Sequence, residues 1–492
     1  MNSSKDLFNL ISSLTKSEKR YFTASNRTGS VYLKLFHEIE RQSAKGIYDE
    51  KAIKDKYKDE KFIRQLTYTK NYLYSLISDN LIRYHNKNNI ESYIYSLITS
   101  AKIFFTKSLF ENYFKNIEKA KLLAEKYERF GILIELIALQ KHLIRAKDLN
   151  RIKLSTLQKE EETVVKRIKN IDDYSKLFGT LNILIKRLNI SGSRTAIITI
   201  EKILEDKLLS SEKYTLSVQA KDIYYDLKIY SADFNNIPED VIELLLRKKE
   251  NYAANEEIFK MNVNFQLSTI TYNLAAIYLE QKNIPEFEKH FNFYKDLKAK
   301  DNITGLLNDL EMNSLLLKFI FLNRDSSDFK KYAESVLKYA NENQDKITKD
   351  YLLSIYYNIS VLQFESGDIE SSLNTLNILM NHRFKNFRKD LLSAAKLLSL
   401  FIHYELGNID LLENLLRSLK RNKNITSTQI IIAEHLTQLI NPKNIHSPKN
   451  KKLKIILSDL RFGIQKLKKD RFEKHIFRYF DPEPWIVKKI NL

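Results

Sequence analysis

The sequence predicts an all-α fold: a right-handed helical-repeat solenoid of antiparallel helix pairs, with a period of about 40 residues. Helix-breaking residues are scarce, since the 492 residues contain only 9 glycines and 6 prolines, and this scarcity favours long helices with short connections. Apolar residues recur at helical spacing along most of the chain. Two stretches, 272–291 and 357–376, are also similar in sequence. Such similarity is typical of stacked repeats, because one helix pair cannot bury its apolar face alone.

Residues 1–90 are expected to form an N-terminal helical cap or small helical bundle. The pattern predicts short helices at 7–14, 31–40 and 48–57, and a longer one at 62–84. Thr15 and Glu18 have the spacing of a capping box that opens a further helix. A cap would shield the end of the solenoid. The alternative is a DNA-binding domain whose last helix enters a groove and contacts phosphate through Arg64 and Lys70.

Residues 91–440 are expected to form the solenoid. The two similar stretches have identical residues at aligned positions, which are Tyr272/Tyr357, Asn273/Asn358, Glu280/Glu365 and Ile284/Ile369. In each stretch a striped helix is followed by a polar break and a second striped helix. The clear breaks are at 281–283, 366–368 and 406–408, with others at 323–325, near 231–233, and at Lys107, Lys147 and Arg187. This spacing gives the period of about 40 residues.

Residues 271–291 and 356–376 resemble tetratricopeptide repeats. Tyr272, Asn273 and Tyr278 match the first helix of that family, and Gly367 matches its turn. Lys282 departs from the family at the same turn, and the period is longer than the family's. The chain is therefore best described as tetratricopeptide-like.

The resemblance implies a concave surface that is lined by the first helix of each pair. In this family an asparagine on the first helix can hold the backbone of an extended peptide. Tyr272, Asn273, Tyr357 and Asn358 are therefore candidates for peptide binding. The alternative is that the Tyr-Asn pairs serve only packing and helix capping.

Residues 441–492 are expected to form a basic loop and a C-terminal helix that docks on the last repeat. Lys451, Lys452, Lys468 and Lys469 lie in this basic region and are candidates, with Arg64 and Lys70, for contact with a polyanion. The only tryptophan, Trp485, follows a pair of prolines and is expected to anchor the chain end to the solenoid. The opening at 13–22 and this ending together resemble a group of uncharacterised bacterial helical-repeat proteins, a resemblance that implies no activity.

Composition narrows the function. The net charge is +20, and positive charge is concentrated in residues 1–200 and 401–492. Such ends could attract a polyanion, although a lysine-rich composition on solvated faces accounts for the same charge. Cysteine is absent, which excludes disulfides, thiol catalysis and thiolate zinc sites. No signal peptide or transmembrane segment is recognisable, so a cytoplasmic protein is expected.

No motif for catalysis is present in the sequence. Phosphate-binding glycine loops, paired histidines at ligand spacing and serine elbows are all missing. We therefore expect no enzyme activity, no cofactor and no metal site. The leading hypothesis is a scaffold that binds another protein or peptide on its concave face. The alternative is a nucleic-acid-binding or regulatory protein in which the basic N-terminal region contacts phosphate and the repeats sense a partner.

Overall fold

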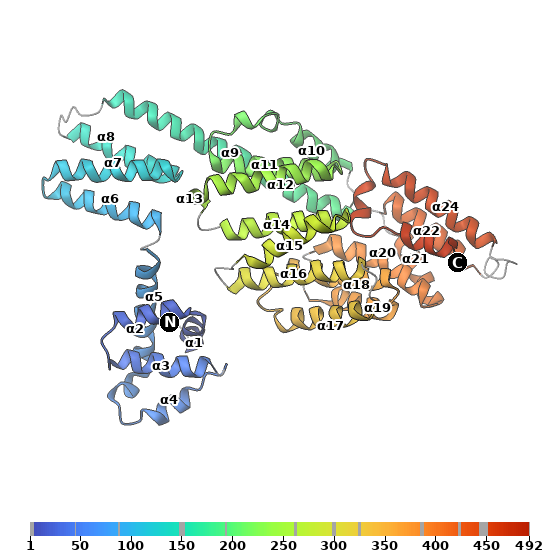
Figure 1. The fold of residues 1–492 in the computed structure, drawn as a ribbon, viewed down its shortest axis with the longest axis horizontal. Coiled ribbons are helices and arrows are strands. Elements are labelled where there is room, and N and C mark those ends of the chain that lie inside the picture. Colours follow the sequence, from blue (N-terminus) through green and yellow to red (C-terminus); the bar gives the residue numbers. More distant parts are fainter. Residues whose placement is uncertain are drawn as a thin grey trace. The chain divides into compact units, whose positions relative to one another are not determined.

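Figure 1 shows a computed structural model of the protein. The structure describes residues 4–44, 46–86, 89–146, 153–191, 194–259, 263–297, 302–322, 326–383, 388–421, 425–441 and 451–491. Within these ranges the chain forms helices and connections and contains no strand, so the all-α prediction is confirmed. The chain divides into two compact units, Met1–Val165 and Lys166–Leu492. No helix in the described ranges combines the length and the apolar character needed to cross a membrane.

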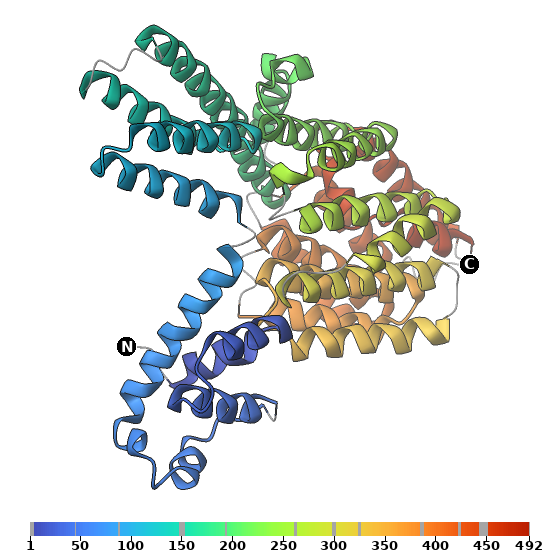
Figure 2. The ribbon, with the colours of Figure 1, turned by 60° about the vertical axis from the view of Figure 1, so that its left-hand side comes forward.

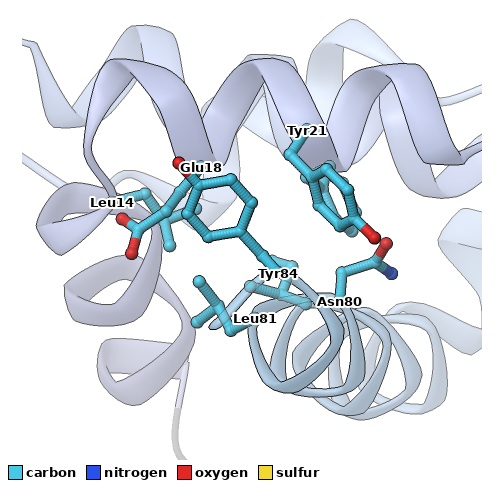
Figure 3. Close-up of a pocket in the computed structure, with 8 residues that line it drawn as sticks. Leu14, Glu18, Tyr21, Asn80, Leu81 and Tyr84 are labelled. Carbon is cyan, nitrogen blue, oxygen red and sulfur yellow. The ribbon is translucent and has the colours of Figure 1, made fainter. Parts of the chain in front are cut away.

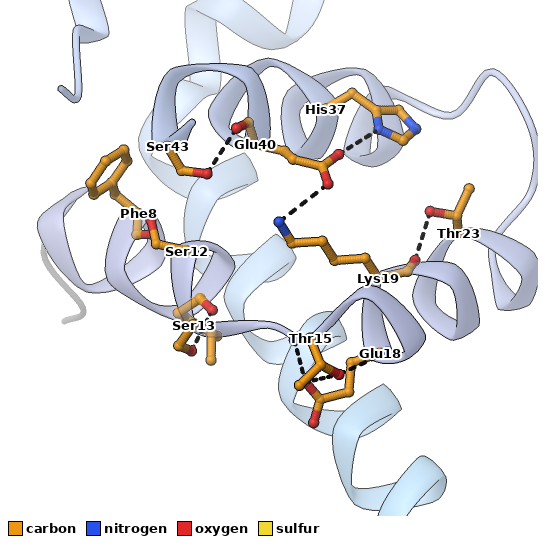
Figure 4. A network of polar contacts seen from close by, with 11 residues as sticks. Phe8, Ser12, Ser13, Thr15, Glu18, Lys19, Thr23, His37, Glu40 and Ser43 are labelled. Atoms are coloured by element: carbon orange, nitrogen blue, oxygen red, sulfur yellow. Dashed lines mark hydrogen bonds and ion pairs between the residues drawn. The ribbon is translucent and has the colours of Figure 1, made fainter. Parts of the chain in front are cut away.

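The first unit begins with a small helical bundle. Its elements are α1 (Ser4–Ser13), α2 (Lys16–Ser25), α3 (Val31–Ser43), α4 (Glu50–Lys56), the 3-10 helix η1 (Lys61–Gln65) and α5 (Leu66–Asn86). The predicted capping box is confirmed, because Thr15 and Glu18 exchange hydrogen bonds at the start of α2. The fully buried Phe36 and Ile39 of α3 lie in the bundle's core. Figure 4 shows the polar contacts that join α2 to α3, including Lys19 to Glu40 at 3.3 Å.

Three helices of similar length follow in the first unit. They are α6 (Ile90–Thr106), α7 (Phe110–Lys126) and α8 (Phe130–Ala146), and each packs on the next. The predicted break at Lys107 is confirmed, since this residue caps α6 at its C-terminus. The long helix α9 (Leu154–Ser191) begins in the first unit and ends in the second.

The break predicted at Arg187 is wrong, because α9 continues to Ser191. Tyr174 and Leu181 are buried along this helix in one core with residues of α10 and α11, so packing stabilises an uninterrupted helix here. The break predicted near 231–233 begins at Asn235. The breaks predicted at Lys147 and at 323–325 lie outside the described residues.

The second unit contains successive helix pairs. Its helices are α10 (Arg194–Leu204), α11 (Val218–Phe234), α12 (Pro238–Ala254), α13 (Glu256–Phe259), α14 (Val263–Glu280), α15 (Ile284–Asp296), α16 (Asn302–Leu322), α17 (Ser326–Glu342), α18 (Lys349–Ser366), α19 (Ile369–Asn381), α20 (Lys389–Glu405), α21 (Ile409–Lys420), α22 (Ser427–Leu439), α24 (Lys451–Lys468) and α25 (Glu483–Asn491). The predicted breaks at 281–283, 366–368 and 406–408 are confirmed as the connections within three of these pairs.

The packing of these pairs follows a regular order, visible in the ribbons of Figures 1 and 2. Each first helix contacts its own partner, as α14 contacts α15 and α18 contacts α19. First helices also contact one another, from α14 to α16, α16 to α18 and α18 to α20. The basic helix α24 packs on α22, and α25 packs on α24.

Candidate functional site

The first helices of three pairs end in the same way. Glu280, Glu365 and Glu405 are the last or next-to-last residues of α14, α18 and α20. Each glutamate lies two residues before a residue in the left-handed conformation, which is Lys282, Gly367 or Gly407. Because the turns align, the three carboxylates occupy equivalent positions on α14, α18 and α20, of which α18 and α20 are in contact.

We call the surface that these equivalent positions mark the first-helix face. It comprises Thr269, Asn273 and Glu280 of α14, Glu311 and Lys318 of α16, and Ser354, Asn358 and Glu365 of α18. On α14 and α18 these residues recur at spacings of four and seven, which places them on one side of a helix. None of them is in the buried core.

Charges alternate across this face. The Lys318 ammonium contacts the Glu280 carboxylate at 2.7 Å. Burial raises the pKa of Glu365, and the charge of Lys318 opposes that shift. The Glu365 side chain is exposed on this face. One lysine thus lies between two carboxylates on adjacent helices.

A third carboxylate belongs to the same face. Burial raises the pKa of Glu311, which accepts a hydrogen bond of 2.6 Å from the Tyr294 hydroxyl. Tyr272 lies beside Tyr294, with ring centroids 6.3 Å apart, and burial, together with the charge of Glu311, raises the pKa of Tyr272. The face therefore has more carboxylates than ammonium groups.

The end of the chain, residues 470–491, lies on the continuation of this face; we call it the C-terminal segment. The Trp485 indole donates a hydrogen bond to Oε1 of Glu405 at 2.6 Å, and the Lys489 ammonium donates to Oε2 at 2.9 Å. The indole also packs edge-on against Phe401 and Tyr404, at centroid distances of 5.1 and 5.5 Å. Trp485 thus anchors the chain end on α20.

Two further aromatic residues attach the same segment to α18. Phe480 packs between Phe364 of α18 and Phe401 of α20, at 5.7 and 5.1 Å. The Tyr357 hydroxyl donates to the backbone carbonyl of Tyr479 at 3.2 Å. Tyr357 is only 2% exposed, and its hydroxyl is already bound to the chain's own C-terminal segment.

A polar network extends from Tyr479 into the repeats. Its hydroxyl donates to Oδ2 of Asp390 at 3.0 Å, and Arg388 makes a bidentate contact with the same carboxylate. Arg388 also donates to the Ser354 hydroxyl at 2.8 Å. Burial acts to raise the pKa of Asp390, but the hydrogen bonds and charge of Arg388 outweigh it and hold that pKa below its usual value.

The beginning of the C-terminal segment contacts helices far away in sequence. Arg471 donates to Glu201 of α10 at 2.6 Å, and Arg478 donates to Asp233 of α11 at 2.7 Å. The His475 ring stacks on Phe234 at 4.6 Å. The segment therefore joins α10 and α11 to α18 and α20 within the second unit.

The structure distributes the predicted peptide-binding residues between core and surface. Asn273 is half-buried and Asn358 is exposed, and both lie on the first-helix face. Tyr272 is half-buried against the core of its own pair. Tyr357 is buried beneath Tyr479.

The predicted polyanion contacts belong to both units and differ in their exposure and pairing. Arg64 is exposed on η1, whereas Lys70 is buried and pairs with Glu50 at 2.6 Å. Lys451, Lys452 and Lys469 are exposed at the two ends of α24. Lys468 is neutralised by Asp481 and Glu483, each at 2.6 Å.

Figure 3 shows a hollow in the first unit that lies between α2 and α5. It is lined by Leu14, Glu18, Tyr21, Phe22, Ile77, Asn80, Leu81 and Tyr84, and these side chains leave essentially no space for a water molecule between them. Glu18 pairs there with His85 at 2.7 Å, and the Tyr21 and Tyr84 rings lie 5.1 Å apart. Ligand pockets are commonly larger than this, so the hollow offers little room.

The described ranges contain no cluster of three histidine, aspartate or glutamate residues that could hold a metal ion. Comparison of the chain with protein families, with curated proteins and with solved structures finds no match.

Sequence reasoning missed Glu405 and the role of the residues around Trp485. A signal for Glu405 was present, since the order Glu-x-Gly-x-Ile occurs at both 365–369 and 405–409. No comparable signal connects Trp485 with Glu405, because the two residues are 80 positions apart.

Proposed function

We propose that this protein is a non-catalytic scaffold that binds a segment of another protein on the first-helix face of α14, α16 and α18. The observation that carries this proposal is the C-terminal segment, which lies on the same face where it continues on α18 and α20. The fold therefore already holds one peptide segment there. The open part of the face has the same architecture and an equivalent row of carboxylates.

The proposal includes a right-handed, tetratricopeptide-like solenoid with a period of about 40 residues. Support comes from the contacts of each first helix with its partner and with the next first helix. This order is expected when every pair buries its apolar stripe against its neighbours. Cytoplasmic location also belongs to this proposal, in keeping with the absence of cysteine from the sequence.

Selection of peptide ligands from a random library displayed on phage tests the function. The full-length protein is compared with the double variant Asn273→Ala and Asn358→Ala, which keeps the carboxylates. We expect selected peptides to lose about tenfold in affinity for this variant, because each amide can hold a peptide backbone through two hydrogen bonds.

The matched control is Asn292→Ala with Asn374→Ala, which removes two exposed asparagines from the second helices α15 and α19. Circular dichroism and melting of both double variants should equal those of the unchanged protein. Peptides that bind both double variants equally well, or a library that yields no ligand, would contradict the proposed function.

A second candidate is nucleic-acid binding through α24. Lys451, Lys452, Lys454 and Lys466 are exposed on this helix, and Lys469 is exposed directly after it. Binding through these lysines should weaken steeply between 50 and 200 mM salt. Fluorescence anisotropy with a labelled oligonucleotide measures this dependence, and Lys451→Gln with Lys452→Gln should lower its slope. No binding at 50 mM salt would rule out this candidate.

A further inference from the structure

We propose that the first-helix face recognises a cationic helical turn in which an aromatic residue is followed, four positions later, by a lysine. This inference rests on the proposed function and adds the chemical class of the ligand. Within the chain, Trp485 and Lys489 on α25 form such a turn and bind a carboxylate at an equivalent position.

Glu405 binds two donors from one helical turn. Trp485 and Lys489 are four residues apart on one helix, so their side chains lie on the same side. Their two donors reach the two oxygens of the single Glu405 carboxylate at 2.6 and 2.9 Å. The carboxylate thus recognises both the position of the indole and the charge that follows it.

Two further carboxylates have the same position on their helices as Glu405. Glu365 and Glu280 occupy on α18 and α14 the position that Glu405 has on α20. Glu365 is exposed, and the Glu280 side chain is 63% exposed. Within the described residues, neither of them is held by an indole or by the C-terminal segment. Glu365 is therefore available to an external donor pair, whereas Glu280 already pairs with Lys318.

An apolar residue lies beside each of these carboxylates. Phe401 lies one helical turn before Glu405 and supports the indole. The equivalent residues are Val361 on α18 and Ala276 on α14, both of which are half-buried. These apolar side chains offer an aromatic ring an apolar surface at the position that Phe401 has beside Glu405.

The open part of the face carries more negative than positive groups. The open face contains Glu280, Glu311 and Glu365 but only one lysine, Lys318, and Asp481 adds to the negative potential at Glu365. A ligand with a positive charge offsets this excess, whereas an acidic ligand would be repelled. Lys318 already neutralises Glu280 at 2.7 Å, so Glu365 is the stronger receptor of the two.

The test uses a labelled synthetic peptide with the sequence of residues 483–491 and the full-length protein. Fluorescence anisotropy should show binding that weakens about tenfold in Glu365→Gln, since a charge-assisted hydrogen bond is lost. Glu288→Gln, at an exposed position on α15, is the matched control and should leave binding unchanged. Peptides in which alanine replaces either the tryptophan or the second lysine should also bind about tenfold more weakly.

The outcomes separate this inference from the proposed function. If phage selection yields ligands that need Asn273 and Asn358 but lack the aromatic and lysine pair, the inference fails and the proposed function stands. Equal binding of the peptide to the unchanged protein and to Glu365→Gln overturns the inference. Concentration-dependent dimers that disappear in Lys489→Ala would support the inference but overturn the proposed function, because the bound segment would then belong to a second copy and not to another protein.

Discussion

Single carboxylates hold the end of the chain in place. Glu483 accepts hydrogen bonds from Lys468 at 2.6 Å, from Gln465 at 2.7 Å and from Arg461 at 3.2 Å. These contacts, led by that from Lys468, lower the pKa of Glu483 to about 2. Because the ionised form is stabilised in the folded protein, the junction between α24 and α25 depends on this charge.

Acid should weaken this junction. The folded pKa of Glu483 lies below its usual value, so its stabilisation is fully present above about pH 5 and is lost as the pH falls toward 2. Glu483→Gln should lower the free energy of unfolding by about 1–2 kcal/mol at pH 7 and by less near pH 3. Melting curves of the two proteins between pH 3 and 7 measure this difference. A difference that does not change with pH would mean that hydrogen bonding alone, without charge, holds the segment.

The identity of the repeated residues predicted only in part which of them are exposed on the first-helix face. Asn273 and Asn358 share a sequence context and both reach the first-helix face. Tyr272 and Tyr357 share that context as well, yet Tyr357 is buried under Tyr479. The C-terminal segment covers α18 and does not contact Tyr272, so identical residues acquire different surroundings from a remote part of the chain.

At the scale of elements, the breaks between helices were the most predictable feature. Gly367 and Gly407 end their helices in the left-handed conformation, which glycine adopts without strain. Lys282 adopts the same conformation, with φ of 57°, at the equivalent turn of α14. A non-glycine residue is strained there, so the turn is set by the pairing of α14 with α15.

Exchanging residues at these turns should shift stability in opposite directions. Gly367→Ala should lower the free energy of unfolding by about 1 kcal/mol, and Lys282→Gly should raise it by a similar amount. An added Cβ at Gly367 would meet no atom within 4 Å, so only backbone strain is measured. Gly131→Ala, which also meets no atom but lies inside α8, is the control and should stabilise. Urea unfolding gives the values, and a neutral Gly367→Ala would show that this turn relaxes.

The break predicted at Arg187 does not occur, because the period alone does not predict where a packed helix ends. Its spacing from other breaks fitted the period, but α9 packs against α10 and α11 along its second half. A local polar sequence does not interrupt a helix that neighbouring elements cover.

At the scale of the second unit, the C-terminal segment connects helices that are far apart in sequence. Arg478 donates to Asp233 and Asn236, and His475 stacks on Phe234, while Trp485 holds Glu405. The segment thus closes a long stretch of chain and should limit relative movement of the pairs between α11 and α20.

Removing the Arg478 contacts should loosen this connection without unfolding the repeats. In Arg478→Ala, amide hydrogen exchange should become faster in residues 470–480 and at the end of α11, with an unchanged rate in the first unit. The cost in global stability should be about 1 kcal/mol or less, because the pair is partly exposed. Arg417→Ala breaks an exposed ion pair within α21 and serves as the control. Unchanged exchange in both segments would mean that aromatic packing alone holds them.

The sequence by itself determined the helices, most breaks between them and the repetition of Asn and Glu on the first helices. These features are local, since they follow from periodicity, capping and turn residues within a few positions. Only the tertiary structure decided which part of the first-helix face stays open. The C-terminal segment is held in place by contacts with residues that are 80 to 270 positions away in the sequence. Such contacts depend on how the apolar and charged surfaces of different helices pack against one another, and a local sequence pattern does not predict that packing.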